Sequence, residues 1–95
     1  MKKKELVERM KALVSDVADI DLCMLESSRR QNCVEARIIL VKVLLDRGLH
    51  ESETAGFLGV TRQAVNKLKN SFSFRIKDWS FRQLYEEVRK AADYP

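Results

Sequence analysis

The sequence predicts an all-α fold, a small bundle of about five to six helices, on three observations. Its 95 residues include only 3 Gly and 1 Pro, too few to punctuate a series of short strands. Leu, Ala, Glu, Lys and Arg dominate the composition, and these residues favour helices. Apolar residues recur at helical spacing in several segments. Because a chain of this length holds one hydrophobic core, we expect residues 1–95 to form a single domain.

The first helix is predicted from about Lys4 to Ile20. Its apolar residues recur at steps of four and three positions, which places them on one face of a helix. They are Leu6, Met10, Leu13, Val17 and Ile20. Polar residues, Lys11 among them, fall on the opposite face, which is expected to meet solvent. Residues 19–30 combine a short apolar cluster with a polar tail, so a short helix and a connection are expected there.

A third helix is predicted from Asn32 to Gly48. The Asn32 side chain can cap its first turn, and Glu35 can complete a capping box. The apolar run at residues 38–45 makes this helix the centre of the core. Because that run is also rich in β-forming residues, a buried strand is the alternative. The cap, the terminating glycine and the length favour the helix.

The C-terminal helix is predicted at about residues 80–92, with Ser80 and Gln83 as a second capping box. Its apolar face consists of Phe81, Leu84, Tyr85, Val88 and Ala92. Residues 71–79 alternate polar and apolar side chains, and two interpretations stay open: a short extended arm, or a loop held by its aromatic residues. We expect the nearby aromatic residues to fill the core, with a dimer contact as the alternative. They are Phe72, Phe74, Trp79 and Phe81.

Residues 50–70 carry the pattern of a helix-turn-helix. Such a motif needs a small residue where its two helices approach and a glycine with positive φ at the turn. Ala55 and Gly59 occupy those two positions, and Thr61 is placed to cap the second helix. The motif also needs apolar residues that pack between its two helices and fix the angle between them. Leu58, Val60, Val65 and Leu68 occupy those positions. An ordinary helical hairpin, which also uses glycine between its helices, is the alternative.

The outward face of the second helix in this motif is predicted to contact DNA. With Val65 and Leu68 inside, the turn of about 100° per residue directs polar side chains outward. These are Gln63, Asn66, Lys67 and Asn70, flanked by Arg62 and Lys69. Gln and Asn can pair with adenine and Arg with guanine in the major groove, while Lys contacts phosphates. The free amides after Thr61 can hold a backbone phosphate. Ordinary solvated polar residues are the alternative.

The charge distribution indicates an anionic partner. The formal net charge is +4, a modest excess. However, no Asp or Glu occurs between Thr61 and Lys77, whereas the preceding segment contains Asp46, Glu51 and Glu53. A segment whose charged residues are all positive is typical of a surface that faces phosphates.

The order of elements from about Asp19 to Asn70 points to a known family. The segment contains Ser28-Arg29-Arg30, then Val34-Glu35-Ala36-Arg37-Ile38, a run of Leu and Val to Leu45, and Gly48 before the predicted helix-turn-helix. It resembles the C-terminal DNA-binding domain of the bacterial replication initiator DnaA, in a wider fold group that includes the Trp repressor. Related modules occur in some transposase-associated proteins.

The resemblance implies roles for arginines outside the motif. Arg29, with Arg30 beside it, would reach the minor groove or a phosphate, and Arg37 would approach the DNA backbone. The turn Gly59-Val60-Thr61-Arg62-Gln63-Ala64-Val65 is shorter than the one with which DnaA reads its site, so binding to that site does not follow. The chain also lacks a Gly-x-x-x-x-Gly-Lys nucleotide loop, which excludes an initiator in its own right.

Other classes of protein find little support in the sequence. No set of nucleophile, base and orienting residue is visible, so we expect no enzymatic activity, no cofactor and no small-molecule substrate. His50 is expected to cap a helix or to lie near a phosphate. Cys23 and Cys33 lack metal-ligand spacing and are expected to be free thiols that are buried or half-buried. No stretch reaches the roughly 18 apolar residues of a membrane span, and a cytoplasmic protein that binds no membrane is expected.

The sequence thus predicts a small protein that binds double-stranded DNA, as a transcriptional regulator or as an accessory factor of replication or of a mobile element. A homodimer would double its contacts across two half-sites. The alternative is a protein-interaction module that has lost DNA contact. An RNA-binding module has less support, because no aromatic stacking platform accompanies the basic strip.

Overall fold

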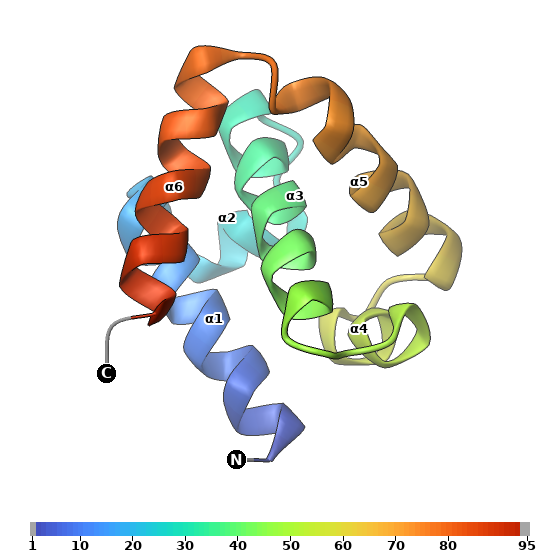
Figure 1. The fold of residues 1–95 in the computed structure, drawn as a ribbon. Coiled ribbons are helices and arrows are strands. Elements are labelled where there is room, and N and C mark those ends of the chain that lie inside the picture. The colour runs from blue at the N-terminus through green and yellow to red at the C-terminus, as the bar shows by residue number, and fades with distance from the viewer. Residues whose placement is uncertain (1, 94–95) are drawn as a thin grey trace.

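The computed structural model describes residues 2–93, and over this range the chain forms α-helices and no strand. The helices are α1 (Lys3–Ala18), α2 (Leu22–Ser27), α3 (Gln31–Asp46), α4 (Glu51–Leu58), α5 (Arg62–Arg75) and α6 (Trp79–Asp93). Figure 1 shows α3 running through the middle of the molecule, with α6 on one side and α5 on the other. The predicted all-α architecture of five to six helices is confirmed over the described residues.

Helix α3 is the central element because it is apolar around most of its circumference. Its buried residues are Cys33, Ala36, Ile38, Ile39, Leu40, Val41, Val43 and Leu44. Because residues 31–46 form an α-helix, the alternative of a buried strand is excluded. As predicted, a glycine follows the helix: Gly48 has φ +99°, and the chain turns there toward α4.

The predicted cap of α3 is wrong. The helix begins at Gln31, so Arg30 occupies the N-cap position, and no side chain caps the first turn. Asn32 lies exposed inside that turn. The start of the helix is instead held from outside: the Arg37 guanidinium donates to the carbonyl oxygens of Leu25 and Ser28, each at 2.8 Å. The end of α2 and the loop before α3 are thereby fixed to α3 nearly two turns after it begins.

Helix α1 packs against α3 and α6 with a register that differs from the predicted one. Val7, Met10 and Val14 are buried, whereas the predicted apolar residues other than Met10 are only partly buried. Lys11, predicted on the solvent face, is also buried. Its ammonium is 3.0 Å from a carboxylate oxygen of Glu26 on α2. The aliphatic part of the lysine therefore packs inside while its charge is paired at the edge.

Residues 71–79 form neither an arm nor a loop. Helix α5 continues to Arg75, and a short turn leads into α6 at Trp79. Phe72 explains the extension, because its ring meets Phe81 edge-on at 5.7 Å and Tyr85 at 4.8 Å between centroids. These contacts join the end of α5 to α6, and such aromatic pairs stabilise a fold.

The cap predicted at Ser80 is wrong, since α6 begins one residue earlier. Asp78 caps the helix, because its Oδ1 accepts a hydrogen bond of 3.1 Å from the Phe81 amide. The apolar face of α6 is as predicted: Phe81, Tyr85, Val88 and Ala92 are buried, and Leu84 packs against the same core.

Candidate nucleic-acid interface

Helices α4 and α5 meet in a tight turn whose geometry follows the predicted positions. Gly59 adopts φ +69° at the end of α4. The Thr61 hydroxyl accepts a hydrogen bond of 3.0 Å from the Ala64 amide and so caps α5. Ala55, Val65 and Val41 of α3 form a small buried cluster beneath the turn. Leu58, Val60 and Leu68 pack around that cluster, so the two helices are held at a fixed angle.

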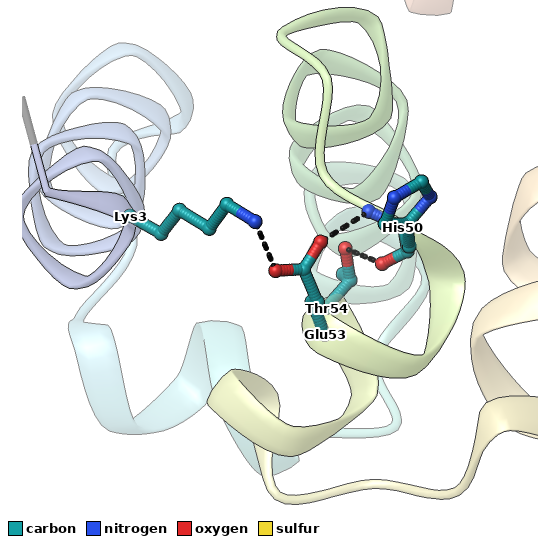
Figure 2. Close-up of polar contacts among 4 residues, drawn as sticks. All are labelled: Lys3, His50, Glu53 and Thr54. Carbon is teal, nitrogen blue, oxygen red and sulfur yellow. Dashed lines mark hydrogen bonds and ion pairs between the residues drawn. The ribbon is translucent and has the colours of Figure 1, made fainter.

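The start of α4 is anchored by polar contacts that Figure 2 shows in detail. The His50 amide donates to Oε1 of Glu53 at 3.0 Å, and Thr54 Oγ1 donates to the His50 carbonyl at 3.0 Å. His50 occupies the N-cap position, as predicted. The other oxygen of Glu53 pairs with the Lys3 ammonium, so α1 is tied to α4. Lys3 and the His50 amide hold the pKa of Glu53 below its ordinary value.

The outward face of α5 is exposed along its length. Val65 points into the core and is fully buried, while four polar side chains on the other side of the helix are exposed. They are Gln63, Asn66, Lys67 and Asn70. Together with Ser71 and Phe74 they line a shallow depression on the surface. The prediction that these side chains project outward is confirmed.

This outward face holds donors and acceptors at an accessible surface. The Asn70 amide nitrogen donates to the Asn66 side-chain oxygen at 3.1 Å, which orients two carboxamides side by side and leaves each with further hydrogen-bonding capacity. Among residues 2–93, the Lys67 ammonium has no ion-pair partner. The face therefore offers a free positive charge beside amides that can donate and accept.

The flank of α5 near α4 is less positive than its sequence indicates. The Lys69 ammonium lies 2.9 Å from Oε1 of Glu51. Lys69, and to a lesser degree Arg62, holds the pKa of Glu51 below its ordinary value. Lys69 therefore helps to bind α4 to α5, and Arg62, which is exposed at the start of α5, is the remaining cation on that flank.

The arginines near α3 separate into two kinds. Arg29 and Arg30 are exposed in the connection before α3. The Arg75 guanidinium at the end of α5 lies 3.7 Å from the Glu35 carboxylate near the start of α3, so this connection is near the C-terminal end of α5. Arg37 is half-buried, and its guanidinium bonds to protein carbonyl groups. The structure thus gives Arg37 a role in shaping the loop that carries Arg29 and Arg30.

The aromatic residues of the C-terminal region divide in a way that the sequence analysis did not anticipate. Phe81 is buried and Phe72 packs against it, as a core role requires. Phe74 and Trp79 are instead 74% and 68% exposed. The spacing contained a signal for Phe74, because it follows Asn70 by four residues and so shares the outward face of α5. Its aromatic character pointed instead to the core, where such residues usually lie.

Several other features bear on the kind of site. Within residues 2–93, no group of three or more His, Cys, Asp or Glu side chains is placed to hold a metal ion. Both cysteines are free thiols, and Cys33 is buried as expected. Cys23 is exposed, so the expectation that it is at least half-buried is wrong. None of the helices in the described part of the chain is long and apolar enough to cross a bilayer.

No protein-family model, curated protein or solved structure matches the chain.

Proposed function

We propose that this protein binds double-stranded DNA sequence-specifically through a helix-turn-helix made of α4 and α5, with α5 in the major groove. It would act as a regulator of transcription or as an accessory protein of replication or of a mobile element, without enzymatic activity. The single observation that carries the proposal is the outward face of α5: an exposed, carboxylate-free row of amides and cations on a rigid helix.

The shape of this face suits the major groove. A helix of 14 residues is about 21 Å long and about 10 Å wide, and the groove of B-DNA is roughly 12 Å wide. The cap at Thr61 and the cluster around Val65 hold the helix in place before DNA arrives. The backbone of α5 therefore loses little conformational freedom when DNA binds, which favours affinity.

The chemistry of the face suits base edges and phosphates. Gln63 and the paired carboxamides of Asn66 and Asn70 can each meet the N6 and N7 positions of adenine. Lys67 suits a phosphate at the groove edge, and the helix start after Thr61 presents free amides to another. Arg29 and Arg30 supply further positive charge near the far end of α5. The resemblance to the DNA-binding domain of DnaA agrees with this assignment.

Selection from a random duplex library, followed by sequencing of the bound pool, tests the proposal. We expect the full chain to enrich a defined sequence. The double substitution Gln63→Ala with Asn66→Ala should lower the affinity for that sequence about thirtyfold or more, because each of the two lost base contacts costs about 1–3 kcal/mol. It should change the affinity for unrelated duplex much less, since phosphate contacts remain.

Gln83→Ala with Ser80→Ala provides the matched control, since both are exposed polar residues on α6, outside the outward face of α5. This variant should enrich the same sequence with unchanged affinity. Absence of any enriched sequence for the full chain, or equal loss in both double variants, would contradict the proposal. Circular dichroism of each variant shows whether the helices are intact.

A protein-interaction module remains the second candidate, because Phe74 and Trp79 leave large apolar surfaces in solvent, and exposed apolar patches often mark interfaces. In that case the library selection would enrich nothing.

A homodimer on DNA is a separate part of the proposal. It predicts that the enriched sequence contains two half-sites about one helical turn apart, and sedimentation of the complex would give two chains per duplex.

A further inference from the structure

Phe74 is an unusual residue for the place it occupies. Its side chain is 74% exposed on a helix whose outward face is otherwise polar. Phe72, two residues earlier, is packed against Phe81 and Tyr85. The fold therefore does not need Phe74 for its core, and its ring is held in solvent at the end of α5. The exposed ring is therefore free to contact another molecule.

Its direction around the helix axis connects Phe74 to the candidate interface. At about 100° per residue, Phe74 falls within about 40° of Gln63 and of Asn70. The shallow depression on this face confirms the connection, since Phe74 lines it together with Gln63, Asn66 and Asn70. The apolar ring thus continues the same row of side chains that is proposed to meet base edges.

The distance along the helix fits a duplex lying beneath α5. Phe74 follows Gln63 by 11 positions, which corresponds to about 16 Å along the helix axis and to roughly five base pairs at 3.4 Å each. Positive charge is available for phosphates at that end. The Lys77 ammonium lies 6.0 Å from the centre of the Phe74 ring, and Arg29 and Arg30 are exposed in the connection near the same end of α5.

The major groove contains one apolar group that such a ring can contact. Adenine, guanine and cytosine present hydrogen-bonding atoms there, and only thymine adds a methyl group, at C5. We propose that Phe74 is a specificity-determining residue that reads the 5-methyl group of a thymine at the end of the DNA site bound by the C-terminal half of α5. This inference rests on the proposed function and deepens it.

Deoxyuridine tests the proposal because it differs from thymidine only in lacking that methyl group. In the sequence enriched by the full chain, each thymidine is replaced in turn by deoxyuridine, and affinities are measured by fluorescence anisotropy. At one position the replacement should weaken binding of the full chain about fourfold, as expected for one buried methyl group at about 0.8 kcal/mol. For Phe74→Ala the same replacement should have no effect, while other positions keep their effects.

Trp79→Ala is the matched control, since Trp79 is also an exposed aromatic residue but lies on α6. It should discriminate thymidine from deoxyuridine as the full chain does. Three results would overturn the assignment of Phe74: an enriched sequence without thymine, full discrimination by Phe74→Ala, or a change in self-association in place of a change in DNA affinity. Failure of the full chain to enrich any duplex would instead contradict the proposed function itself.

Discussion

Glu53 illustrates how one side chain links segments that lie far apart in sequence. Its carboxylate accepts from the His50 amide at the start of α4 and pairs with Lys3 of α1. Both contacts favour the charged form, and the Lys3 contact is the larger cause of the lowered pKa. Neither the sequence position of Lys3 nor its type indicated this partner, because only the packing of α1 brings the two residues together.

The lowered pKa of Glu53 predicts how its contribution to stability depends on pH. The folded protein protonates this carboxyl group at lower pH than the unfolded chain does, whose ordinary value is 4.5. The contribution is therefore fully present above about pH 4.5 and is lost as the pH falls through the folded value. Glu53→Gln should lower the free energy of unfolding at pH 7, and the difference from the unaltered chain should be smaller at pH 3.

Urea unfolding at both pH values measures this difference. Glu87→Gln is the control, because Glu87 is exposed on α6 and has no ion-pair partner within the described residues. Its substitution should leave stability nearly unchanged at pH 7. A Glu53→Gln effect of the same size at both pH values would show that the carboxylate charge contributes nothing.

Single residues of the candidate site were predicted unevenly, and the reason is physical. Positions set by local geometry were found from spacing alone: Thr61 as a cap, and Gln63 and Asn66 as outward side chains. Roles set by distant partners were not. Lys69 pairs with Glu51, and Arg37 donates to the carbonyl groups of Leu25 in α2 and of Ser28 after it; the spacing indicated neither contact.

At the scale of elements, the turn between α4 and α5 depends on the backbone of Gly59. Its φ of +69° lies in the left-handed region, and a Cβ at this position would meet no atom within 4 Å. Any cost of Gly59→Ala therefore comes from the backbone conformation and not from a clash. We expect this substitution to lower the free energy of unfolding by about 1–2 kcal/mol, as measured in urea.

Gly56 offers a control of opposite sign within the same motif. It lies inside α4 with helical backbone, and a Cβ there also has open space. Because alanine favours a helix over glycine, Gly56→Ala should raise the free energy of unfolding by about 0.5–1 kcal/mol. If both substitutions changed stability in the same direction, the account of the turn would be wrong.

The helices were predicted well where periodicity is long and less well at their ends. The apolar residues of α3 and α6 predicted two helices correctly, since a buried face repeats over several turns. The caps at Asn32 and Ser80 were wrong because residues outside those helices decide where they begin: Arg37 holds the loop before α3, and Asp78 caps α6. The extension of α5 through residues 71–75 depends on the packing of Phe72, a contact that local sequence does not encode.

At the scale of the whole molecule, the helices form a main core and an outer pair. Helices α1, α3 and α6 build the main core, while α4 and α5 form an outer pair on the other side of α3 (Figure 1). The net charge of +4 does not by itself identify a partner. The sequence could predict an all-α domain and a candidate interface, but the exposure of Phe74 and Trp79 depends on how the whole chain packs.

If the outward face of α5 lies against duplex DNA, its side-chain amide resonances report the contact. A ¹H–¹⁵N spectrum of the full chain is recorded while the enriched duplex is added. We expect the carboxamide signals of Gln63, Asn66 and Asn70 to shift strongly, while that of Gln83 on α6 stays in place. Unchanged signals from the three α5 residues in a complex that has demonstrably formed would show that DNA binds elsewhere on the molecule.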